Sequence, residues 1–434
     1  MTEQSNRQTY KFAFVMITSL FFMWGFVHNL DPILIPHLRK SFSLTVLEAA
    51  LVDSAVFIAY FVMALPAGLL IRKTGYKNTM LCGLGLFAVG ALLFIPAADT
   101  HRYVFFLGAL FVIACGLTVL ETAANPYVTL LGKPERATQR LNLAQSFNGL
   151  AAMLAPIAGA RLILVDGHSD AQLQAMSEGA RQAALAAEAA SVKGPYLAIA
   201  LVIVAIAVVF FFLKVPAIGA AADNVQPAPA KGTIMRAWRR SSIRRAVVAQ
   251  FFYVGAQVCV FSFFILYATR AAGVSQIAAA DYLGWGCGTA FVVGRFVGTW
   301  LMKYIAPARL LLVYSLASVA LCAVAMFASG TASLVAVIGI AFFMSIMFPT
   351  IFSLGIRDAG ADTEMGSSLI VMSIVGGAVL PLLFGAISDM TRNLQYGYAA
   401  PLLCFLVVGW FARTVPQEAQ SEAVTTSTGS IAHV

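Results

Sequence analysis

The sequence contains few charged residues for its length. Only 11% of its 434 residues are Asp, Glu, Lys or Arg, whereas soluble globular proteins have about 25%. Hydrophobic residues make up 60% of the chain. Apolar runs of about 20 residues, the length that crosses a bilayer as a helix, recur from end to end. This composition excludes an ordinary soluble protein and predicts a membrane protein with many spans.

Sequence signatures of cofactor chemistry are also missing. The six cysteines fall in apolar runs and form no C-x-x-C pair, so we interpret them as small hydrophobic residues. The sequence has no nucleotide-binding loop, zinc motif or Ser/His/Asp cluster. The glycines of "GLGLFAVG" and "GLTVLETAAN" follow no predicted strand and are interpreted as helix-packing residues. We expect no metal, no cofactor and no enzymatic activity.

The positive net charge has a simple explanation in a membrane protein. A net charge of +9 can indicate nucleic-acid binding, but the inner loops of polytopic proteins are basic because of their topology. The first apolar run is too long for a signal peptide, and no small-residue cleavage site follows it. We expect the lipid bilayer and a small solute as partners, no nucleic acid, and a monomer.

Twelve apolar segments are predicted to form transmembrane helices. The predicted fold class is therefore an all-α polytopic membrane protein with two six-helix halves. The predicted spans are residues 12–36, 46–71, 78–97, 102–131, 140–165, 195–215, 243–271, 278–303, 309–328, 333–356, 364–390 and 396–414. An alanine-rich polar loop at 166–194 leaves room for a short helix.

The segments outside the spans predict the domain organisation and the orientation. Residues 216–242, with small residues and prolines before a basic cluster, form a linker between halves at 1–215 and 243–414. A Ser/Thr-rich, disordered tail is expected at 415–434. With the N-terminus inside, nineteen Lys and Arg residues fall in inner segments and seven in outer loops. This bias predicts a membrane protein with both termini in the cytoplasm.

The two halves resemble each other in sequence. At a shift of 230 residues "FFMWG" aligns with "FFYVG", and at 223 residues "PYVTLLG" aligns with "PTIFSLG", so that span 1 matches span 7 and span 4 matches span 10. Parallel repeats of this kind build transporters whose halves rock around a site near the membrane midplane.

Polar side chains interrupt three spans of the first half. Glu121 and Asn125 are four residues apart in span 4 and share one helix face. Span 5 carries a polar stripe with Gln145 and Asn148 three residues apart. Since an acid inside a span is costly and usually functional, we interpret Glu121 as a functional residue.

Span 1 carries a second acid in "FVHNLDPILIP". Trp24, His28 and Asp31 are spaced to share one helix face, and Pro32 follows the acid directly. The proline frees the carbonyl of His28 and moves Asp31 away from helical geometry. We therefore assign Asp31, together with Glu121, as a candidate for proton coupling.

The matching positions of the second half carry rings. Phe261 aligns with Asp31, and Phe348 aligns with Asn125. A cavity with one polar wall and one aromatic wall suits a sugar, because hydroxyls need paired donors and acceptors while the C–H face of the ring stacks on aromatics.

Structural roles compete with this interpretation. Polar residues also join helices without binding a ligand, and for Asn29 and Asn142 both roles stay open. The cavity is favoured for Gln145 and Asn148. Arg295, near the inner end of span 8, is interpreted as a gate or a loop anchor rather than a ligand of the solute.

Several motifs resemble the L-fucose:proton symporter group of the major facilitator superfamily. They are "FFMWGFVHNLDPILIPHL", "AYFVMALPAGLLIRKTGYK", "LETAANPYVTLLG", "RLNLAQSFN", "AQFFYVGAQ", "GRFVGTWL" and "FPTIFSLGI". The resemblance implies uptake of a hexose or deoxyhexose driven by a proton gradient. It also implies site roles for Trp24, Asn29, Glu121, Gln145 and Asn148.

The sequence departs from the expected patterns at three places. Members of the group often read N-L-N-D in span 1, whereas this chain reads "NLDP", which moves the acid one place back to Asp31. Phe261 and Phe348 keep the group's aromatic rings without a hydrogen-bonding atom. The superfamily's usual acid in the loop after span 2 is absent, with Arg72 in its place, as this group tends to have.

The leading hypothesis is a proton-coupled sugar symporter, with L-fucose as the first candidate substrate. The alternatives are uptake of galactose, glucose or N-acetylglucosamine, and a facilitator or antiporter for another small polar solute. A membrane-embedded enzyme is disfavoured because the sequence has no nucleophile–base pair, and a sensor because it has no soluble signalling domain.

Overall fold

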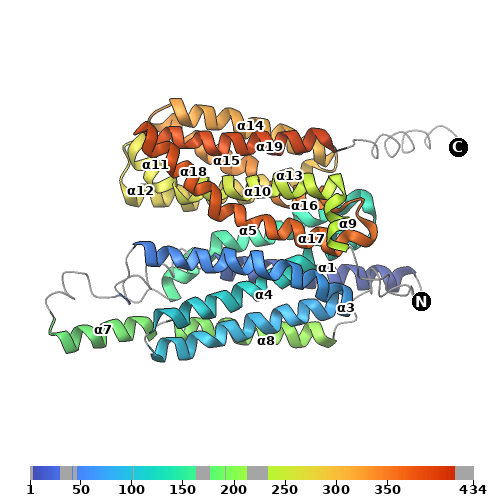
Figure 1. Ribbon diagram of the computed structural model, residues 1–434, viewed down its shortest axis with the longest axis horizontal. Coiled ribbons are helices and arrows are strands. Elements are labelled where there is room, and N and C mark those ends of the chain that lie inside the picture. The colour runs from blue at the N-terminus through green and yellow to red at the C-terminus, as the bar shows by residue number, and fades with distance from the viewer. Residues whose placement is uncertain are drawn as a thin grey trace. The chain divides into compact units, whose positions relative to one another are not determined.

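The computed structural model describes residues 3–29, 42, 46–100, 102–162, 176–190, 192–212 and 233–415. Within these ranges all regular structure is helical, with no strand (Figure 1). This agrees with the predicted all-α fold class.

Among the described residues, seven helices precede the predicted linker. They are α1 (Glu3–His28), α3 (Val46–Thr100), α4 (Tyr103–Leu130), the short η1 (Pro134–Arg136), α5 (Ala137–Leu162), α7 (Glu178–Ala190) and α8 (Lys193–Phe212). Helix α7 confirms the short helix expected in the loop at 166–194, and α9 (Thr233–Arg239) lies in the predicted linker.

The rest of the chain is more often interrupted. It contains α10 (Ser241–Ser262), α11 (Phe264–Ala271), α12 (Gln276–Asp281), the π-helical η2 (Tyr282–Gly288), α13 (Thr289–Leu301), α14 (Pro307–Phe327), α15 (Thr331–Met344) and α16 (Met347–Ile356). These are followed by η3 (Gly360–Asp362), α17 (Thr363–Met372), η4 (Ser373–Val375), α18 (Gly376–Thr391), η5 (Leu394–Tyr398) and α19 (Ala399–Thr414).

Helices occupy all twelve predicted spans within the described residues. Eight of them are long and apolar enough to cross a membrane, and α1 adds the shorter apolar segment Phe14–His28. The predicted spans 2 and 3 both lie in α3, and the non-helical backbone of Gly75 (φ 83°, ψ 169°) separates them into two helices between residues 71 and 78, as predicted. Glycine adopts this positive φ without the steric penalty of a side chain.

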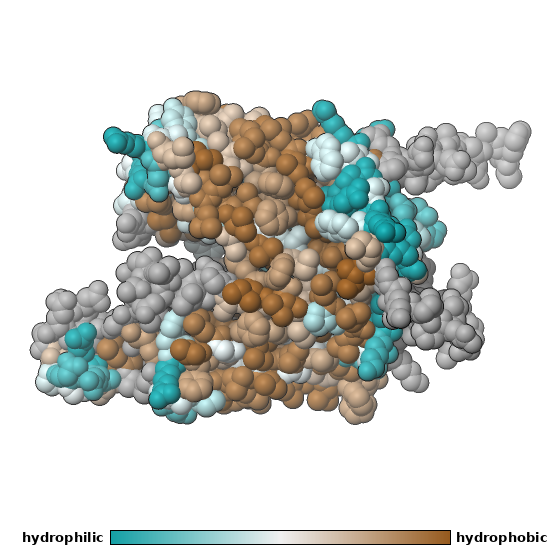
Figure 2. Space-filling model, viewed as in Figure 1, coloured by the Kyte–Doolittle hydropathy of each residue, from teal (hydrophilic) through white to brown (hydrophobic). Residues whose placement is uncertain are grey.

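The chain clusters into two compact units. The first contains Met1–Ala124, Phe147–Lys231 and Ser367–Ala378, and the second contains Asn125–Ser146, Gly232–Gly366 and Val379–Val434. In the second unit α14 packs against α15 and α19, and α10 packs against α16 and α19. Apolar residues dominate the helix surfaces of both units, while hydrophilic residues gather near helix ends (Figure 2).

Glycines bring α3 and α4 together at backbone distance. A Cβ on Gly116 would lie 2.5 Å from the backbone nitrogen of Phe87, and one on Gly90 would lie 2.5 Å from that of Ile113. A Cβ on Gly83 would approach the carbonyl of Gly116 to 3.1 Å. These residues lie in the two glycine-containing motifs, which confirms their interpretation as packing residues. Small residues allow this approach, and van der Waals packing then holds helices together in lipid.

Replacing Gly116 tests this contact. We expect Gly116→Ala to destabilise the protein by about 1–3 kcal/mol, because the new methyl group meets backbone that cannot rotate away. Thermal unfolding in detergent measures the effect. The matched control is Gly108→Ala on the same helix, where a Cβ meets nothing within 4 Å. Equal melting temperatures for the two variants would contradict the close-packing role.

Candidate functional site

The buried acid of α4 has a partner from α3. The hydroxyl of Tyr60 donates to Oε2 of Glu121 at 3.0 Å, and both side chains are buried. A hydrogen bond to a carboxylate contributes about 1.5–3 kcal/mol, so Tyr60 holds the carboxylate in one orientation. Sequence reasoning identified Glu121 and missed Tyr60, because nothing in a sequence pairs residues 61 positions apart.

A second group of predicted residues lies where α1 meets α5. Nδ2 of Asn148 donates to the backbone carbonyl of Phe21 at 3.2 Å. A Cβ on Gly25 would meet the side chain of Asn148 at 2.6 Å, so the two helices nearly touch there. Asn148 therefore joins helices in this structure, the role weighed against sugar binding.

Two other predicted residues of α1 are held locally. The ring of Trp24 is buried and lies 4.1 Å from that of Phe21, between centroids. Nδ2 of Asn29 donates to the carbonyl of Gly25 at 2.7 Å, one turn back in its own helix. Asp31, the predicted coupling acid of span 1, lies outside the described residues.

The predicted amides of α4 and α5 meet in the second unit. Nε2 of Gln145 donates to Oδ1 of Asn125 at 3.2 Å, and both side chains are buried. Within the part of the chain that the structure describes, Nδ2 of Asn125 has no hydrogen-bond partner. The amide nitrogen of Asn125 can therefore donate to a further acceptor. Such an acceptor would remove the cost of a buried donor without a partner, which is about 1–3 kcal/mol.

Arg295 connects this amide pair to two other helices. Its Nη1 donates to the backbone carbonyl of Gln145 at 2.6 Å, and its Nε donates to the carbonyl of Ser345 at 2.7 Å. Pro349 has no N–H and cannot bond the carbonyl four residues earlier, which is that of Ser345. The proline of "FPTIF" thereby creates the acceptor that holds the buried guanidinium of Arg295.

Two aromatic rings extend the contacts of Arg295. Its guanidinium carbon lies 4.5 Å from the ring centroid of Phe291, a distance at which cations are attracted to ring faces. The ring of Phe291 packs edge-on against Phe261 at 5.8 Å between centroids. Phe348 packs edge-on against the buried Tyr253 at 6.4 Å. The structure thus joins the predicted Asn125, Gln145, Arg295 and Phe261 in one chain of contacts.

A polar latch joins the start of α5 to α13 and α16. We define the latch as Thr138, Gln139, Asn142, Thr299, Thr350 and Ser353. The hydroxyls of Thr138 and Ser353 are 2.9 Å apart, and Nδ2 of Asn142 donates to Oγ1 of Thr350 at 3.1 Å. Nε2 of Gln139 donates to the carbonyl of Thr299 at 3.3 Å. Asn142 therefore joins helices here. The hydroxyl residues of the latch were missed because Ser and Thr are common in spans.

The described residues contain no group of three His, Cys, Asp or Glu side chains arranged to hold a metal. The six cysteines are free, and all except Cys82 are buried. Buried acids, amides and aromatic rings on membrane-length helices are typical of helical membrane transporters.

The chain belongs to the Major Facilitator Superfamily, whose family model matches residues 13–368. It is 41% identical to the L-fucose-proton symporter of Escherichia coli (strain K12) over 423 residues, which cover 96% of each chain. It is 39% identical to the glucose/galactose transporter of Brucella abortus biovar 1 (strain 9-941) over 412 residues, covering 94% of this chain and 95% of that protein.

A solved structure agrees with this assignment. The crystal structure of the transporter FucP in the outward conformation matches with a TM-score of 0.88 at 41% identity, covering 94% of this chain and 100% of that chain. The recognition made from the motifs is therefore confirmed, as are the fold class and the expectation of a transporter rather than an enzyme.

A disulfide across the latch tests its geometry. We expect Thr138→Cys with Ser353→Cys to form a disulfide under mild oxidation, because the hydroxyls they replace are in hydrogen-bond contact and an S–S bond of about 2.05 Å needs only a small further approach. Adding Arg295→Lys should slow its formation, since an ammonium does not reproduce the guanidinium fork.

Arg140→Lys is the matched control for that variant. Arg140 also donates to three backbone carbonyls, but those acceptors, on Val128, Thr129 and Lys133, lie at the junction of α4 and α5. Crosslinking is measured after cleavage at a protease site inserted in the linker. Crosslinked protein then migrates on a gel as one species, and protein without the disulfide migrates as two fragments. Equal changes in the rate of crosslinking for Arg295→Lys and Arg140→Lys would contradict the expectation that Arg295 positions the helices joined by the latch.

Proposed function

We propose that this protein is a proton-coupled sugar symporter that imports a hexose or deoxyhexose by alternating access, with L-fucose as the leading substrate. The observation that carries the proposal is the buried pair of Asn125 and Gln145, with an amide donor of Asn125 left for a further acceptor. Sugar hydroxyls accept from amides and donate back to them. The relatives named for L-fucose-proton symport support the same interpretation.

Glucose and galactose are the second candidate substrates. Relatives named as glucose/galactose transporters are 39% identical over most of their length, nearly as similar as the fucose-proton symporter. L-Fucose lacks the hydroxyl that hexoses carry on C6, and Phe261 and Phe348 offer rings without hydrogen-bonding atoms. Rings of this kind suit the deoxy sugar, which keeps L-fucose as the leading candidate.

Uptake into proteoliposomes tests the function directly. We expect purified protein to accumulate radiolabelled L-fucose when the outer solution is more acidic than the lumen, and only to equilibrate it when a protonophore collapses the gradient. Unlabelled D-galactose and D-glucose, added in excess, rank the sugars by inhibition. Equal uptake with and without the gradient would favour a facilitator, and stronger inhibition by D-galactose than by L-fucose itself would make the hexose the substrate.

Three polar side chains and two rings are proposed to form the sugar site. Asn125, Gln145 and Glu121 are proposed to bind hydroxyls, since their side chains offer several donors or acceptors each. Phe261 and Phe348 are proposed to stack on the apolar face of the sugar. Trp24, Asn29 and Asn148 are proposed as further contacts; the bonds of the two amides within α1 and between α1 and α5 would then be exchanged during transport.

The latch is proposed to close the inner end of the transport path. Arg295, which donates to the carbonyls of Gln145 and Ser345, is proposed as the gating residue that positions the helices of the latch. Both termini and the latch are then cytoplasmic, the halves at 1–215 and 243–414 move about the linker 216–242, and the protein acts as a monomer in a bacterial inner membrane. The crosslinked latch variant should accordingly lose uptake and regain it after reduction.

Proton coupling is assigned to Glu121 and Asp31. We expect Glu121→Gln to weaken sugar binding and its pH dependence, because the amide does not take up and release a proton. Asp31→Asn should abolish accumulation but retain counterflow exchange, since exchange needs no net proton transfer. Accumulation against a gradient and exchange at equal sugar concentrations are measured separately.

Tyrosine variants serve as controls for the assignment of Glu121. Tyr60→Phe removes the hydrogen bond to that carboxylate and should reduce kcat/KM about tenfold or more. Tyr398→Phe removes a buried hydroxyl that has no hydrogen-bond partner within the described residues, and should leave uptake unchanged. If Asp31→Asn accumulates sugar as fully as the unmodified protein, proton coupling is assigned to Glu121 alone.

A further inference from the structure

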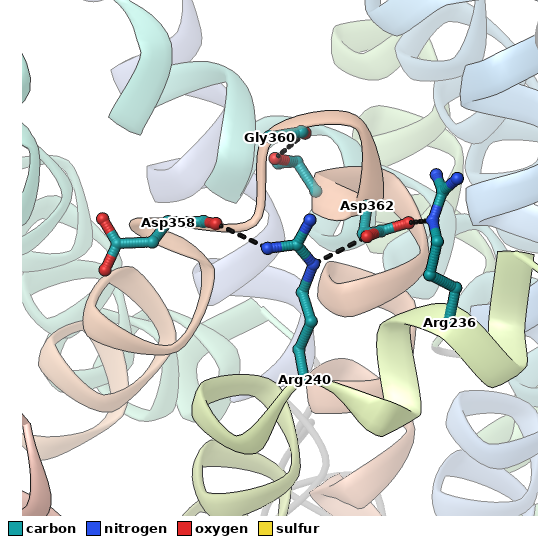
Figure 3. A network of polar contacts seen from close by, with 6 residues as sticks. Arg236, Arg240, Asp358, Gly360 and Asp362 are labelled. Atoms are coloured by element: carbon teal, nitrogen blue, oxygen red, sulfur yellow. Dashed lines mark hydrogen bonds and ion pairs between the residues drawn. The ribbon is translucent and has the colours of Figure 1, made fainter.

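Helix α9 is held to the protein by one buried carboxylate. Asp362, in η3, is fully buried and accepts from Nε of Arg236 at 2.5 Å and from Nε of Arg240 at 2.6 Å (Figure 3). Nη1 of Arg240 also donates to the carbonyl of Asp358 at 3.0 Å. The carboxylate of Asp362 is buried and needs a compensating charge, which the two half-exposed arginines supply. The bonds to Asp362 therefore fix the position of α9 relative to η3.

The opposite face of α9 is apolar and exposed. Ile234 and Trp238 are four residues apart and share one side of the helix, and Met235 follows Ile234 directly; 39%, 39% and 56% of their surfaces are exposed, respectively. Ala237, between them in sequence, is fully buried. Arg236 and Arg240 point to Asp362 (Figure 3), so α9 presents its apolar side away from its attachment.

Helix α9 directly precedes a membrane-spanning helix. Arg240 is extended (φ −68°, ψ 119°) and separates α9 from α10, which begins one residue later and is apolar enough to cross the membrane. The exposed Val248 lies two turns into α10. A short helix with exposed tryptophan and aliphatic side chains at this position matches an element lying in the bilayer interface.

Two arginines, one in the last turn of α9 and one in the first turn of α10, are not used by the protein. Arg239 and Arg244 are exposed, and within the described residues neither forms an ion pair or side-chain hydrogen bond. They differ in this from Arg236 and Arg240, which are committed to Asp362, and from Arg245, which donates to the carbonyl of Thr414. Arginine forks match phosphate oxygens, and basic residues at an interface attract anionic lipid.

We propose that α9 and the start of α10 form a binding site for an anionic phospholipid. The phosphate contacts Arg239 and Arg244, and the acyl chains cover Ile234, Met235 and Trp238. The charge of the two arginines and the apolar face beside them select a lipid over a free phosphate or a zwitterionic lipid. This site is distinct from the proposed sugar site, and its test does not depend on transport.

Native mass spectrometry of the purified protein in detergent tests the site by titration with phosphatidylglycerol and phosphatidylcholine. We expect phosphatidylglycerol to bind more tightly, and Arg239→Gln with Arg244→Gln to weaken it about 25-fold, at about fivefold for each interfacial charge. The matched control is Arg270→Gln, which removes an exposed arginine near the end of α11 and should change binding less than twofold.

A second measurement keeps the proposal falsifiable if the double variant does not fold. Brominated phosphatidylglycerol should quench a fraction of the tryptophan fluorescence that Trp238→Phe removes, and soluble glycerol 3-phosphate should not reverse the quenching. Equal binding of the two lipids by the unmodified protein, equal effects of the double variant and Arg270→Gln, or identical quenching with and without Trp238 would each overturn the proposal. Displacement by glycerol 3-phosphate would make the site a free-phosphate site instead.

Discussion

The guanidinium of Arg295 is the interaction on which the candidate site depends. It donates to the carbonyls of Gln145 and Ser345 and lies against the ring of Phe291. Three helices from distant parts of the sequence are thus positioned by one side chain. A buried charge is tolerated only when its donors are satisfied, and here Pro349 supplies an acceptor by leaving a carbonyl without its helical partner. The proline and the arginine therefore function as a pair.

Two kinds of helix contact in this protein differ in how easily they break. Between α3 and α4, glycines let backbone meet backbone, and separating them would expose a surface that only these two helices fill. At the latch, hydroxyls and amides meet through single hydrogen bonds. Water can replace each such bond at little net cost. The first kind of contact suits helices that stay together, and the second suits helices that separate in each transport cycle.

Some properties of this protein are encoded locally in the sequence, and others depend on which helices become neighbours. The spans, the glycine packing and the buried acid follow from hydropathy, spacing and the cost of charge in lipid, and the structure contains them. The pairing of Tyr60 with Glu121 and the anchoring of Arg295 depend on which helices become neighbours, which spacing within one helix does not encode. The break between the predicted spans 2 and 3 is present in the structure as the non-helical backbone at Gly75. For Asn148, spacing identified a polar face but not its bond to Phe21.

The unpaired amide atoms are best understood through the two states that an alternating-access transporter must populate. Nδ2 of Asn125 and Oδ1 of Asn142 are buried without partners among the described residues, and each belongs to an amide whose other atom is bonded to a neighbouring helix. A fully bonded closed state would be more stable and would release its helices less often. A ligand shifts such an equilibrium only by its difference in affinity for the two states. Each unmet bond weakens the closed state by about 1–3 kcal/mol, so that a smaller difference in the affinity for sugar and proton is enough to open it. Under the proposed gating role of the latch, the unmet Oδ1 of Asn142 brings the closed and open states closer in free energy, which the complete packing between α3 and α4 would not allow.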